Sequence, residues 1–320
     1  MDVLSDVVTA ARAGLPHSAR MLRTAPFGRS LPATGGAGFH AVLRGTAWLI
    51  PPDGDPIPLG TGDVVFLPRG GAHGLADSPS TPLTGASPAV PRSGPGRGTA
   101  PAGDGDTAPA GGAGPATVIL CGAYLLDRSR AHPLLEELPE IVHLGTGAGR
   151  HPGLGSAAGL LGEELERSRP GSDAMVPALL DVLLLQILRA WLDERAGDGA
   201  TTTGWSAALH DPAVAAALRA IHGEPGRRWS VEELGRHAGL SRAAFARRFT
   251  SLVGRPPLAY LTWWRMSVAA RLLHDSDAPS SAVAARVGYA SEFAFAHAFK
   301  RAYGLPPGAY RRRERVRAGE

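Results

Sequence analysis

The 320-residue sequence has little cysteine, few aromatic residues and no long uninterrupted apolar run. Its single cysteine, Cys121, excludes an internal disulfide and a four-thiolate zinc cluster, and is typical of a reducing compartment. The first ten residues carry two aspartates and no basic residue, unlike a signal peptide. The most apolar stretch, residues 174–192, is interrupted by Asp181, Gln186 and Arg189. We therefore expect a cytoplasmic protein without a membrane partner.

Charge is divided unevenly along the chain. Residues 1–208 hold 15 Arg against 20 acidic residues, a balance of −5. Residues 209–320 hold 17 Arg and one Lys against 9 acidic residues, a balance of +9. This asymmetry predicts a basic C-terminal module that binds a polyanion and a mildly acidic partner domain.

The N-terminal part is typical of a β-domain with one insertion. Residues 39–50, 63–68 and 117–126 are rich in strand-forming residues and are separated by turn signals. Residues 78–116 hold 9 Gly and 8 Pro and hardly a large apolar side chain. Such a segment buries too little surface to offset its chain entropy, so we predict a disordered insertion within one domain.

Residues 131–200 turn helical in pattern. Between residues 174 and 192 the apolar positions recur at i, i+3, i+4 and i+7, and they cover about half of the helix circumference. One interpretation is a deeply packed helix, and the other is a homodimer interface, since so wide a face favours two packing partners. For the dimer interpretation the predicted contacts are Leu180, Leu184 and Ile187.

A repeat dominates the C-terminal part. Residues 241–260 match residues 291–310 at an offset of 50, with identical Ser, Phe, Gly, Pro and Tyr positions. Each copy follows a short helical segment and a glycine-containing turn, which is the pattern of a helix-turn-helix. Two such units in tandem present two recognition helices, suited to successive major grooves about 34 Å apart.

This tandem resembles the DNA-binding domain of the AraC/XylS family of transcription regulators. The resemblance covers residues 209–313, with helix-turn-helix units at 231–252 and 281–303, and leaves 314–320 as a basic tail. It rests on a glycine turn that leads to a capping serine, GLS in the first unit and GYAS in the second, and on a closing G-x-x-P-x-x-Y pattern in both. The family's activity implies that the protein activates or represses promoters in double-stranded DNA, acting on RNA polymerase if it is an activator.

Helix geometry divides each recognition helix into a core face and an outward face. The outward positions are the predicted base contacts: Arg242, Ala243, Ala246, Arg247, Glu292, Phe293 and His297. The two arginines are the strongest candidates, because a guanidinium can bind guanine through two hydrogen bonds. The predicted phosphate contacts are Arg248, Lys300, Arg301 and Arg311.

Residues 62–73 fit the pattern G-x5-P-x-G-x2-H, in which a tight turn directs one imidazole into the mouth of a small β-barrel. The segment resembles the cupin-type sensor domains fused to AraC-family regulators, and it implies a barrel over residues 1–130. The first cupin motif is incomplete, since only His40 remains of its ligands.

His40, His73 and Cys121 lie on predicted strands and are expected to converge inside the barrel. Two imidazoles and a thiolate suit one zinc or another divalent metal. The alternatives are a redox-reactive cysteine, an organic effector, or a hydrogen-bonded core without a sensing role. The cofactor is therefore left open.

The sequence thus predicts a multidomain α+β protein: a cupin-like sensor barrel, a helical dimerisation segment and an all-α tandem helix-turn-helix. Its predicted function is sequence-specific DNA binding, modulated by a small ligand, metal or oxidant. The alternative is a cupin metal-dependent enzyme, an oxygenase or isomerase, with a helical appendage. We favour a protein that is not an enzyme, because the ligand set is incomplete and the basic module has no role in catalysis. A barrel that only dimerises is a third interpretation.

Overall fold

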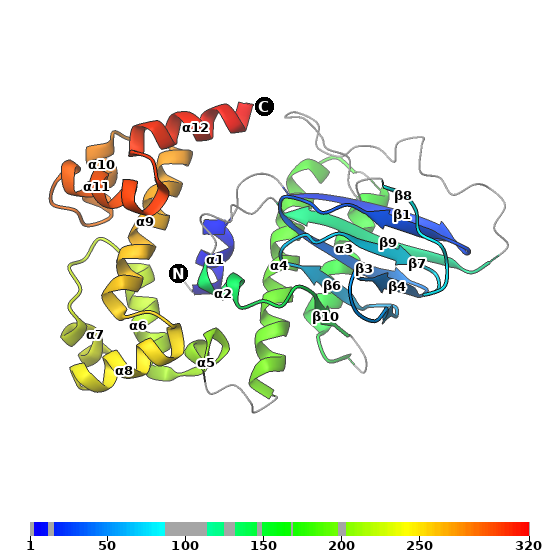
Figure 1. Cartoon of the computed structure of the whole chain (residues 1–320), viewed down its shortest axis with the longest axis horizontal. Coiled ribbons are helices and arrows are strands. Elements are labelled where there is room, and N and C mark those ends of the chain that lie inside the picture. Colours follow the sequence, from blue (N-terminus) through cyan, green and yellow to red (C-terminus); the bar gives the residue numbers. More distant parts are fainter. Residues whose placement is uncertain are drawn as a thin grey trace. The chain divides into compact units, whose positions relative to one another are not determined.

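The computed structural model describes residues 3–11, 16–86, 114–124, 132–145, 149–167, 169–197 and 203–319. The chain forms two compact units. The barrel unit comprises residues 12–128 and 138–191, and the helical unit comprises residues 1–11, 129–137 and 192–320 (Figure 1). The fold class predicted from the sequence, a mixed α+β protein with a β N-terminal part and a helical C-terminal part, is confirmed.

Two five-stranded sheets form the barrel unit, and most of their strands are antiparallel neighbours. The first sheet has the order β1 (His17–Thr24), β9 (Ala116–Tyr124), β3 (Ala37–Arg44), β6 (Val64–Leu67) and β10 (Val142–Leu144). The second has the order β5 (Ile57–Leu59), β4 (Ala47–Ile50), β7 (His73–Ala76), β2 (Gly28–Leu31) and β8 (Thr84–Ala86). Apolar side chains of both sheets form one core, which includes Leu49, Val65, Leu75 and Cys121.

The ends of the predicted disordered insertion are structured, which corrects the expected range 78–116. Thr84–Ala86 forms β8 and pairs in parallel with β2, and Ala116 already begins β9. Gly28 explains the close packing there, since a Cβ on it would overlap the carbonyl oxygen of Pro82. Residues 87–113 lie outside the described residues.

Two helices complete the barrel unit, α3 (Pro152–Arg167) and α4 (Ser172–Gly197), the last residues of α4 belonging to the helical unit. α3 packs against β1 and β3 of the first sheet. Tyr124 at the end of β9 donates a hydrogen bond to the backbone carbonyl of Leu180 in α4, at 2.9 Å. Within the region predicted to be helical, residues 142–144 instead form the strand β10, which pairs with β6.

The residues predicted to form the dimer interface are buried within the chain, which corrects that interpretation. Leu180, Leu184 and Ile187 are at most 3% exposed, so they supply core packing and leave no surface for a second copy. The exposed side of α4 carries Met175 and Val182 instead. Among the described helices, α4 is long and apolar enough to cross a membrane by length and composition, and half of its most apolar window is buried, as in a core helix.

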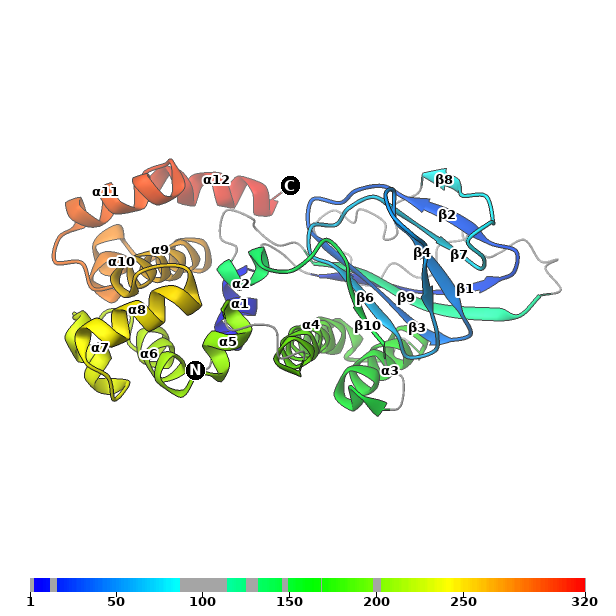
Figure 2. The ribbon, with the colours of Figure 1, turned by 60° about the horizontal axis from the view of Figure 1, so that its bottom comes forward.

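The helical unit is assembled from three separate segments of the chain (Figure 2). The first two supply α1 (Val3–Ala11) and the short α2 (Pro133–Glu136). The third supplies α5 (Trp205–His210), α6 (Pro212–Gly223), α7 (Val231–His237), α8 (Arg242–Val253), α9 (Pro257–Asp275), α10 (Ser280–Arg286), α11 (Glu292–Tyr303) and α12 (Pro307–Gly319). α1 packs against α6 and α9, so residues 3–11 belong to this unit and not to the barrel expected over residues 1–130.

The sequence repeat appears as two similar helix pairs, α7–α8 and α10–α11. The first pair packs against α9 through α8, and the second through both α10 and α11. Ser241 and Ser291 begin the second helices, and each side chain accepts a hydrogen bond from a backbone N–H three residues on. Gly254 and Gly304 end these helices in the left-handed conformation, which glycine adopts without strain. α12 then continues through the residues expected to form a basic tail, and Glu314 within it is buried.

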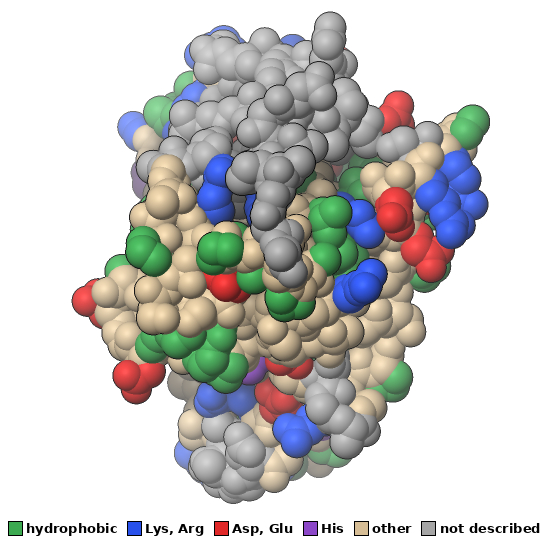
Figure 3. Space-filling view, turned by 90° about the vertical axis from the view of Figure 1, so that its right-hand side faces the viewer, with side chains coloured by type: hydrophobic (Ala, Val, Ile, Leu, Met, Phe, Trp, Pro, Cys, Tyr) green, Lys and Arg blue, Asp and Glu red, His purple; other side chains and the backbone are tan. Residues whose placement is uncertain are grey.

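Basic and acidic side chains of the barrel side are interspersed. Figure 3, which views the molecule from the right-hand side of Figure 1, shows basic and acidic side chains among apolar and uncharged groups, some of opposite sign next to one another. In the sequence, residues 1–208 have a charge balance of −5, against +9 for residues 209–320.

Candidate DNA-reading surface and sensor site

α8 presents one polar face away from its core. Arg242, Ala243 and Arg247 are exposed and Ala246 is half-buried, whereas the phenylalanines on the opposite face are fully buried. Neither Arg242 nor Arg247 makes a hydrogen bond or ion pair with another residue that the structure describes. The two guanidinium groups are therefore available to an external acceptor.

α11 presents the corresponding face of the second helix pair. Glu292, Phe293 and His297 are exposed, and Ala296 is half-buried. Phe293 is 82% exposed, the most exposed large apolar side chain among the described residues. Phe293 therefore takes no part in the core of the helical unit.

Two residues predicted to contact phosphates have partners within the helical unit. The Arg248 guanidinium lies 2.5–2.6 Å from one carboxylate oxygen of Asp211, whose other oxygen accepts the N-cap hydrogen bonds of α6. Arg311 donates to the backbone carbonyls of Leu273 and Ala278. The sequence prediction did not anticipate these structural roles. Lys300 and Arg301 are exposed on α11.

The structure brings His40, His73 and Cys121 together in the barrel unit. His40 on β3 and Cys121 on β9 are register partners, and the imidazole Nδ1 lies 2.9 Å from the Cys121 Sγ. The His40 Nε2 lies 2.7 Å from the Nε2 of His73, which begins β7 in the other sheet. Gly70 makes the turn before His73, since its φ is +57° and a Cβ there would overlap Thr34 and Gly36. We call these three residues the His–His–Cys chain.

The backbone carbonyl of Gly71 determines which nitrogen carries the proton on each histidine of the His–His–Cys chain. The His73 Nδ1 donates to the carbonyl of Gly71 at 2.8 Å, so the His73 Nε2 of a neutral ring must accept from His40. The Nδ1 of His40 then accepts from the Cys121 thiol. Burial lowers the pKa of both histidines and raises the pKa of Cys121, which agrees with three neutral groups.

The geometry does not fit one metal ion held by all three side chains. The lone pairs of the two imidazole nitrogens diverge, and His40 contacts Cys121 through one nitrogen and His73 through the other. A metal ion lies about 2.0–2.3 Å from its ligands. An ion bound to one nitrogen of His40 would therefore have either Cys121 or His73 on the same side of the His40 ring, but not both. Among the described residues, no group of three or more His, Cys, Asp or Glu side chains is placed to hold a metal.

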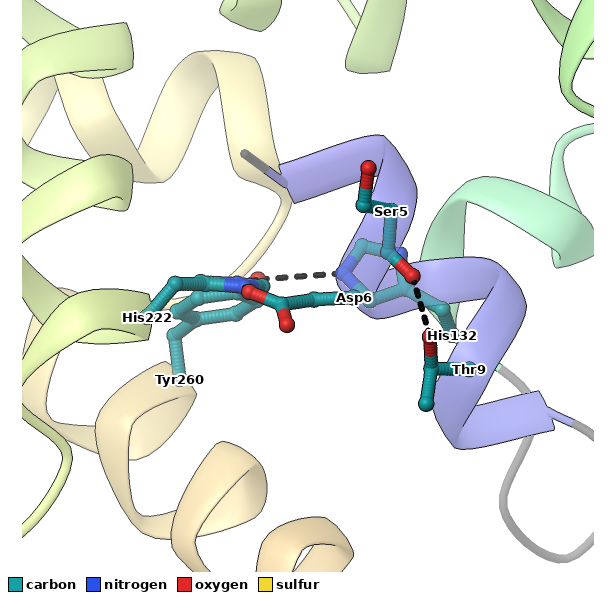
Figure 4. A network of polar contacts seen from close by, with 6 residues as sticks. All are labelled: Ser5, Asp6, Thr9, His132, His222 and Tyr260. Atoms are coloured by element: carbon teal, nitrogen blue, oxygen red, sulfur yellow. Dashed lines mark hydrogen bonds and ion pairs between the residues drawn. The ribbon is translucent and has the colours of Figure 1, made fainter. Parts of the chain in front are cut away.

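Sequence reasoning missed a second buried polar chain, in the helical unit (Figure 4). The His222 Nδ1 on α6 lies 2.9 Å from an Asp6 carboxylate oxygen on α1, and the His222 Nε2 lies 2.7 Å from the Tyr260 hydroxyl on α9. The same hydroxyl lies 3.0 Å from the His132 Nε2. All four residues are buried. Because they come from distant parts of the sequence, no local pattern indicated their contact.

The protons of this second chain follow from the backbone N–H of Leu134, which donates to the His132 Nδ1 at 3.1 Å. The His132 Nε2 therefore donates to Tyr260, and the Tyr260 hydroxyl donates to the His222 Nε2. The Nδ1 of His222 donates to the Asp6 carboxylate. Burial lowers the pKa of His132 and raises that of Tyr260, so both stay neutral. The chain thus fastens α1 and the segment before α2 to α6 and α9.

Two exposed second helices of a tandem helix-turn-helix, joined to a two-sheeted β unit, define a DNA-binding regulator with an N-terminal accessory domain. The comparisons agree with this class. Residues 2–193 match a cupin family model, and residues 234–313 match a helix-turn-helix domain model.

The chain belongs to the AraC-like transcription regulators. It is 36% identical to an AraC-like transcription regulator of Streptomyces antibioticus over 98% of this chain and 99% of the relative. It is 31% identical to the RCS-specific HTH-type transcriptional activator RclR of Escherichia coli over 87% of this chain and 84% of RclR. It is also similar to the DNA-binding domain of AdpA solved with a target DNA, at 38% identity and a TM-score of 0.32, covering 33% of this chain and 96% of that domain.

Proposed function

We propose that this regulator reads promoter DNA with α8 and α11 and that the His–His–Cys chain of the barrel unit modulates the binding. The observation that carries the first part is the exposed face of α8, where two arginines have no partner among the described residues. In the major groove, each can bind guanine O6 and N7 through two hydrogen bonds.

The second helix of the tandem contributes a different chemistry. Glu292 suits a cytosine amino group, and Phe293 suits a thymine methyl. His297 completes this exposed face. Lys300 and Arg301 supply the phosphate contacts, in preference to Arg248 and Arg311, whose guanidinium groups already have partners within the unit.

The His–His–Cys chain is suited to sensing because it crosses the barrel core. The His40–His73 hydrogen bond joins the first sheet to the second, so any species that takes a proton or a lone pair from it weakens a link between the sheets. A protonated pair, an oxidised Cys121 or an ion captured by the two Nε2 atoms would each break the present arrangement. The poor fit to a three-ligand metal argues against the alternative of a metal-dependent cupin enzyme. We propose a cytoplasmic regulator that is not an enzyme.

We also propose a homodimer, formed through surfaces other than the three buried residues of α4, and contact with RNA polymerase if the protein activates transcription. Sedimentation of the full chain with and without DNA tests the dimer. One copy at all concentrations would contradict it.

DNA reading is tested with the purified chain on its own upstream DNA and on random duplexes over a salt series. Arg242→Ala and Arg247→Ala are each expected to lower specific affinity about 5- to 100-fold, because each removes a base contact of about 1–3 kcal/mol. Arg219→Ala, which removes an exposed arginine from α6, is the matched control and should change little. Equal losses in all three variants would refute base reading by α8.

Sensing is tested in the same assay with His73→Gln and His40→Gln, each measured with chelator, with zinc and with hypochlorite. We expect the two variants to change DNA affinity in the same direction, and chelator to leave the wild type unchanged. Folded variants that bind DNA as the wild type does under every condition would remove the His–His–Cys chain from the sensing mechanism.

A further inference from the structure

The loop between α6 and α7, residues 224–230, is held in one conformation by side chains from inside and outside it. Trp229 is buried, and its indole N–H donates to the carbonyl of Glu224 at 3.0 Å. The Arg227 guanidinium lies over the Trp229 ring, 4.0 Å from its centroid. This loop leads directly into the first helix-turn-helix, so its placement sets where α7 begins.

The same loop contacts the turn of the second helix-turn-helix, backbone to backbone. A Cβ placed on Gly226 would lie 2.8 Å from the carbonyl oxygen of Arg286, the last residue of α10. Conversely, a Cβ on Gly288 would overlap the carbonyl oxygen of Gly226. Two glycines 62 positions apart in the printed sequence therefore permit an approach that any other residue would block.

Arg265 on α9 fixes this contact from the third side. Its Nε donates to the carbonyl of Pro225 at 2.7 Å, and its Nη2 donates to the carbonyl of Arg227 at 2.8 Å. These two bonds bracket Gly226 and use the planar fork of a guanidinium, which a lysine lacks. We call Gly226, Arg265 and Gly288 the junction.

The junction is a second link between the two helix-turn-helix units, in addition to α9, against which both units pack (Figure 1). α8 packs on α7, which follows the loop, and α11 packs on α10, which precedes the turn. A linker helix alone leaves its two ends free to bend and twist, whereas a direct contact beside it removes that freedom.

We propose that the junction fixes the separation and orientation of α8 and α11 and so selects the spacing between the two DNA half-sites. Its three members are positioning residues and do not need to contact DNA. One added base pair moves the second half-site by about 3.4 Å and rotates it by about a tenth of a turn, which a rigid pair of helices cannot follow without deforming the DNA. The proposal rests on DNA reading by both recognition helices.

The test uses the full chain and duplexes selected by it from a random library, then remade with one base pair removed or added between the half-sites. Dissociation constants are measured by fluorescence anisotropy at one salt concentration, well below the unfolding temperature. The wild type is expected to lose about tenfold or more in affinity at each altered spacing. Gly226→Ala is expected to bind the best duplex more weakly and to lose less than about threefold on changing the spacing.

Gly223→Ala is the matched control, because a Cβ at Gly223 meets no atom within 4 Å at the end of α6. It should keep the wild-type spacing profile. Arg265→Lys provides a second route to the same result, since it keeps the charge and loses the bracket of two carbonyls. Because Gly226→Ala and Arg265→Lys test the junction independently, one of them still decides the outcome if the other does not fold.

If the folded Gly226→Ala and Arg265→Lys variants both keep the wild-type spacing profile, the role of the junction is overturned, while DNA reading by the recognition helices stands. A wild type that tolerates every spacing would overturn it as well. Loss of all sequence preference in the wild type would overturn DNA reading and the proposal with it, so the two failures are distinguishable. Lower stability by itself does not flatten a spacing profile measured on folded protein.

Discussion

Removing the carboxylate of Asp6 should destabilise the helical unit, although this residue lies at the opposite end of the sequence from most of it. Asp6→Ala leaves the buried His222 Nδ1–H without its acceptor. An unsatisfied buried donor costs about 1–3 kcal/mol. The other carboxylate oxygen of Asp6 is buried without a hydrogen-bond partner, which reduces the contribution of Asp6 to the free energy of unfolding. We therefore expect Asp6→Ala to lower the free energy of unfolding by about 2 kcal/mol. In a unit of this size that lowers the melting temperature by about 4–8 °C.

Tryptophan fluorescence during urea or thermal unfolding measures the effect, because four of the six tryptophans belong to the helical unit. Asp6→Asn keeps an oxygen acceptor of the same shape and should lose less than about 1 kcal/mol. Asp53→Ala removes an exposed carboxylate of the barrel unit and serves as the control. Equal stability of the Asp6→Ala and wild-type helical units would refute the argument that Asp6 holds α1 in place.

Three further predictions concern single features. Gly70→Ala should destabilise the barrel unit by more than about 2 kcal/mol in denaturant unfolding, whereas Gly71→Ala, with open space at its Cβ, should cost far less. Asp211→Ala should cost the helical unit about 1–2 kcal/mol through its lost N-cap, and Asp211→Asn, which keeps the cap, less than half of that. Barrel-unit stability should fall as the pH drops below about 6.5, because the pKa values of His40 and His73 are lowered on folding.

The sign of the pH effect follows from proton uptake. Below about pH 6.5 the unfolded histidines bind protons that the folded ones refuse, so acid favours unfolding until the lowered pKa values are also passed. A barrel transition with the same midpoint at pH 5 and pH 7 would contradict this reasoning. Equal losses of stability in Gly70→Ala and Gly71→Ala would show that the turn accommodates a Cβ. Equal losses in Asp211→Ala and Asp211→Asn would assign the effect to the ion pair with Arg248.

Local patterns carried the prediction of the tandem helix-turn-helix. Its caps, turn glycines and core phenylalanines repeat within short windows, so the sequence alone indicates where each helix starts and which face is outward. The convergence of His40 and Cys121 was also predictable, since both lie on strongly apolar strands of one sheet. The divergent sides of the His40 ring were not, because a residue list does not show which nitrogen faces which partner.

Long-range packing accounts for most of the differences. The apolar face of α4 was wide enough for two partners, and the structure shows Leu184 on that face buried within the chain. The short strand β10 followed a helix-like pattern of only a few residues, and pairing with β6 decided its conformation. The position of α1 depends on contacts with His222 and Tyr260, more than two hundred residues away. Sequence periodicity does not indicate contacts between residues so far apart.

The assembly of the helical unit from three chain segments has a consequence for how such regulators can be recombined. A chimaera that joins a foreign sensor to this protein at residue 209 would carry α6 and α9 but neither α1 nor the His132 segment. It would expose the His222 imidazole and the Tyr260 hydroxyl, which contact Asp6 and His132 of those segments. An exchangeable module therefore includes residues 3–11 and 132–137, and gene fusions that keep only the C-terminal block would transfer a less stable DNA-binding unit.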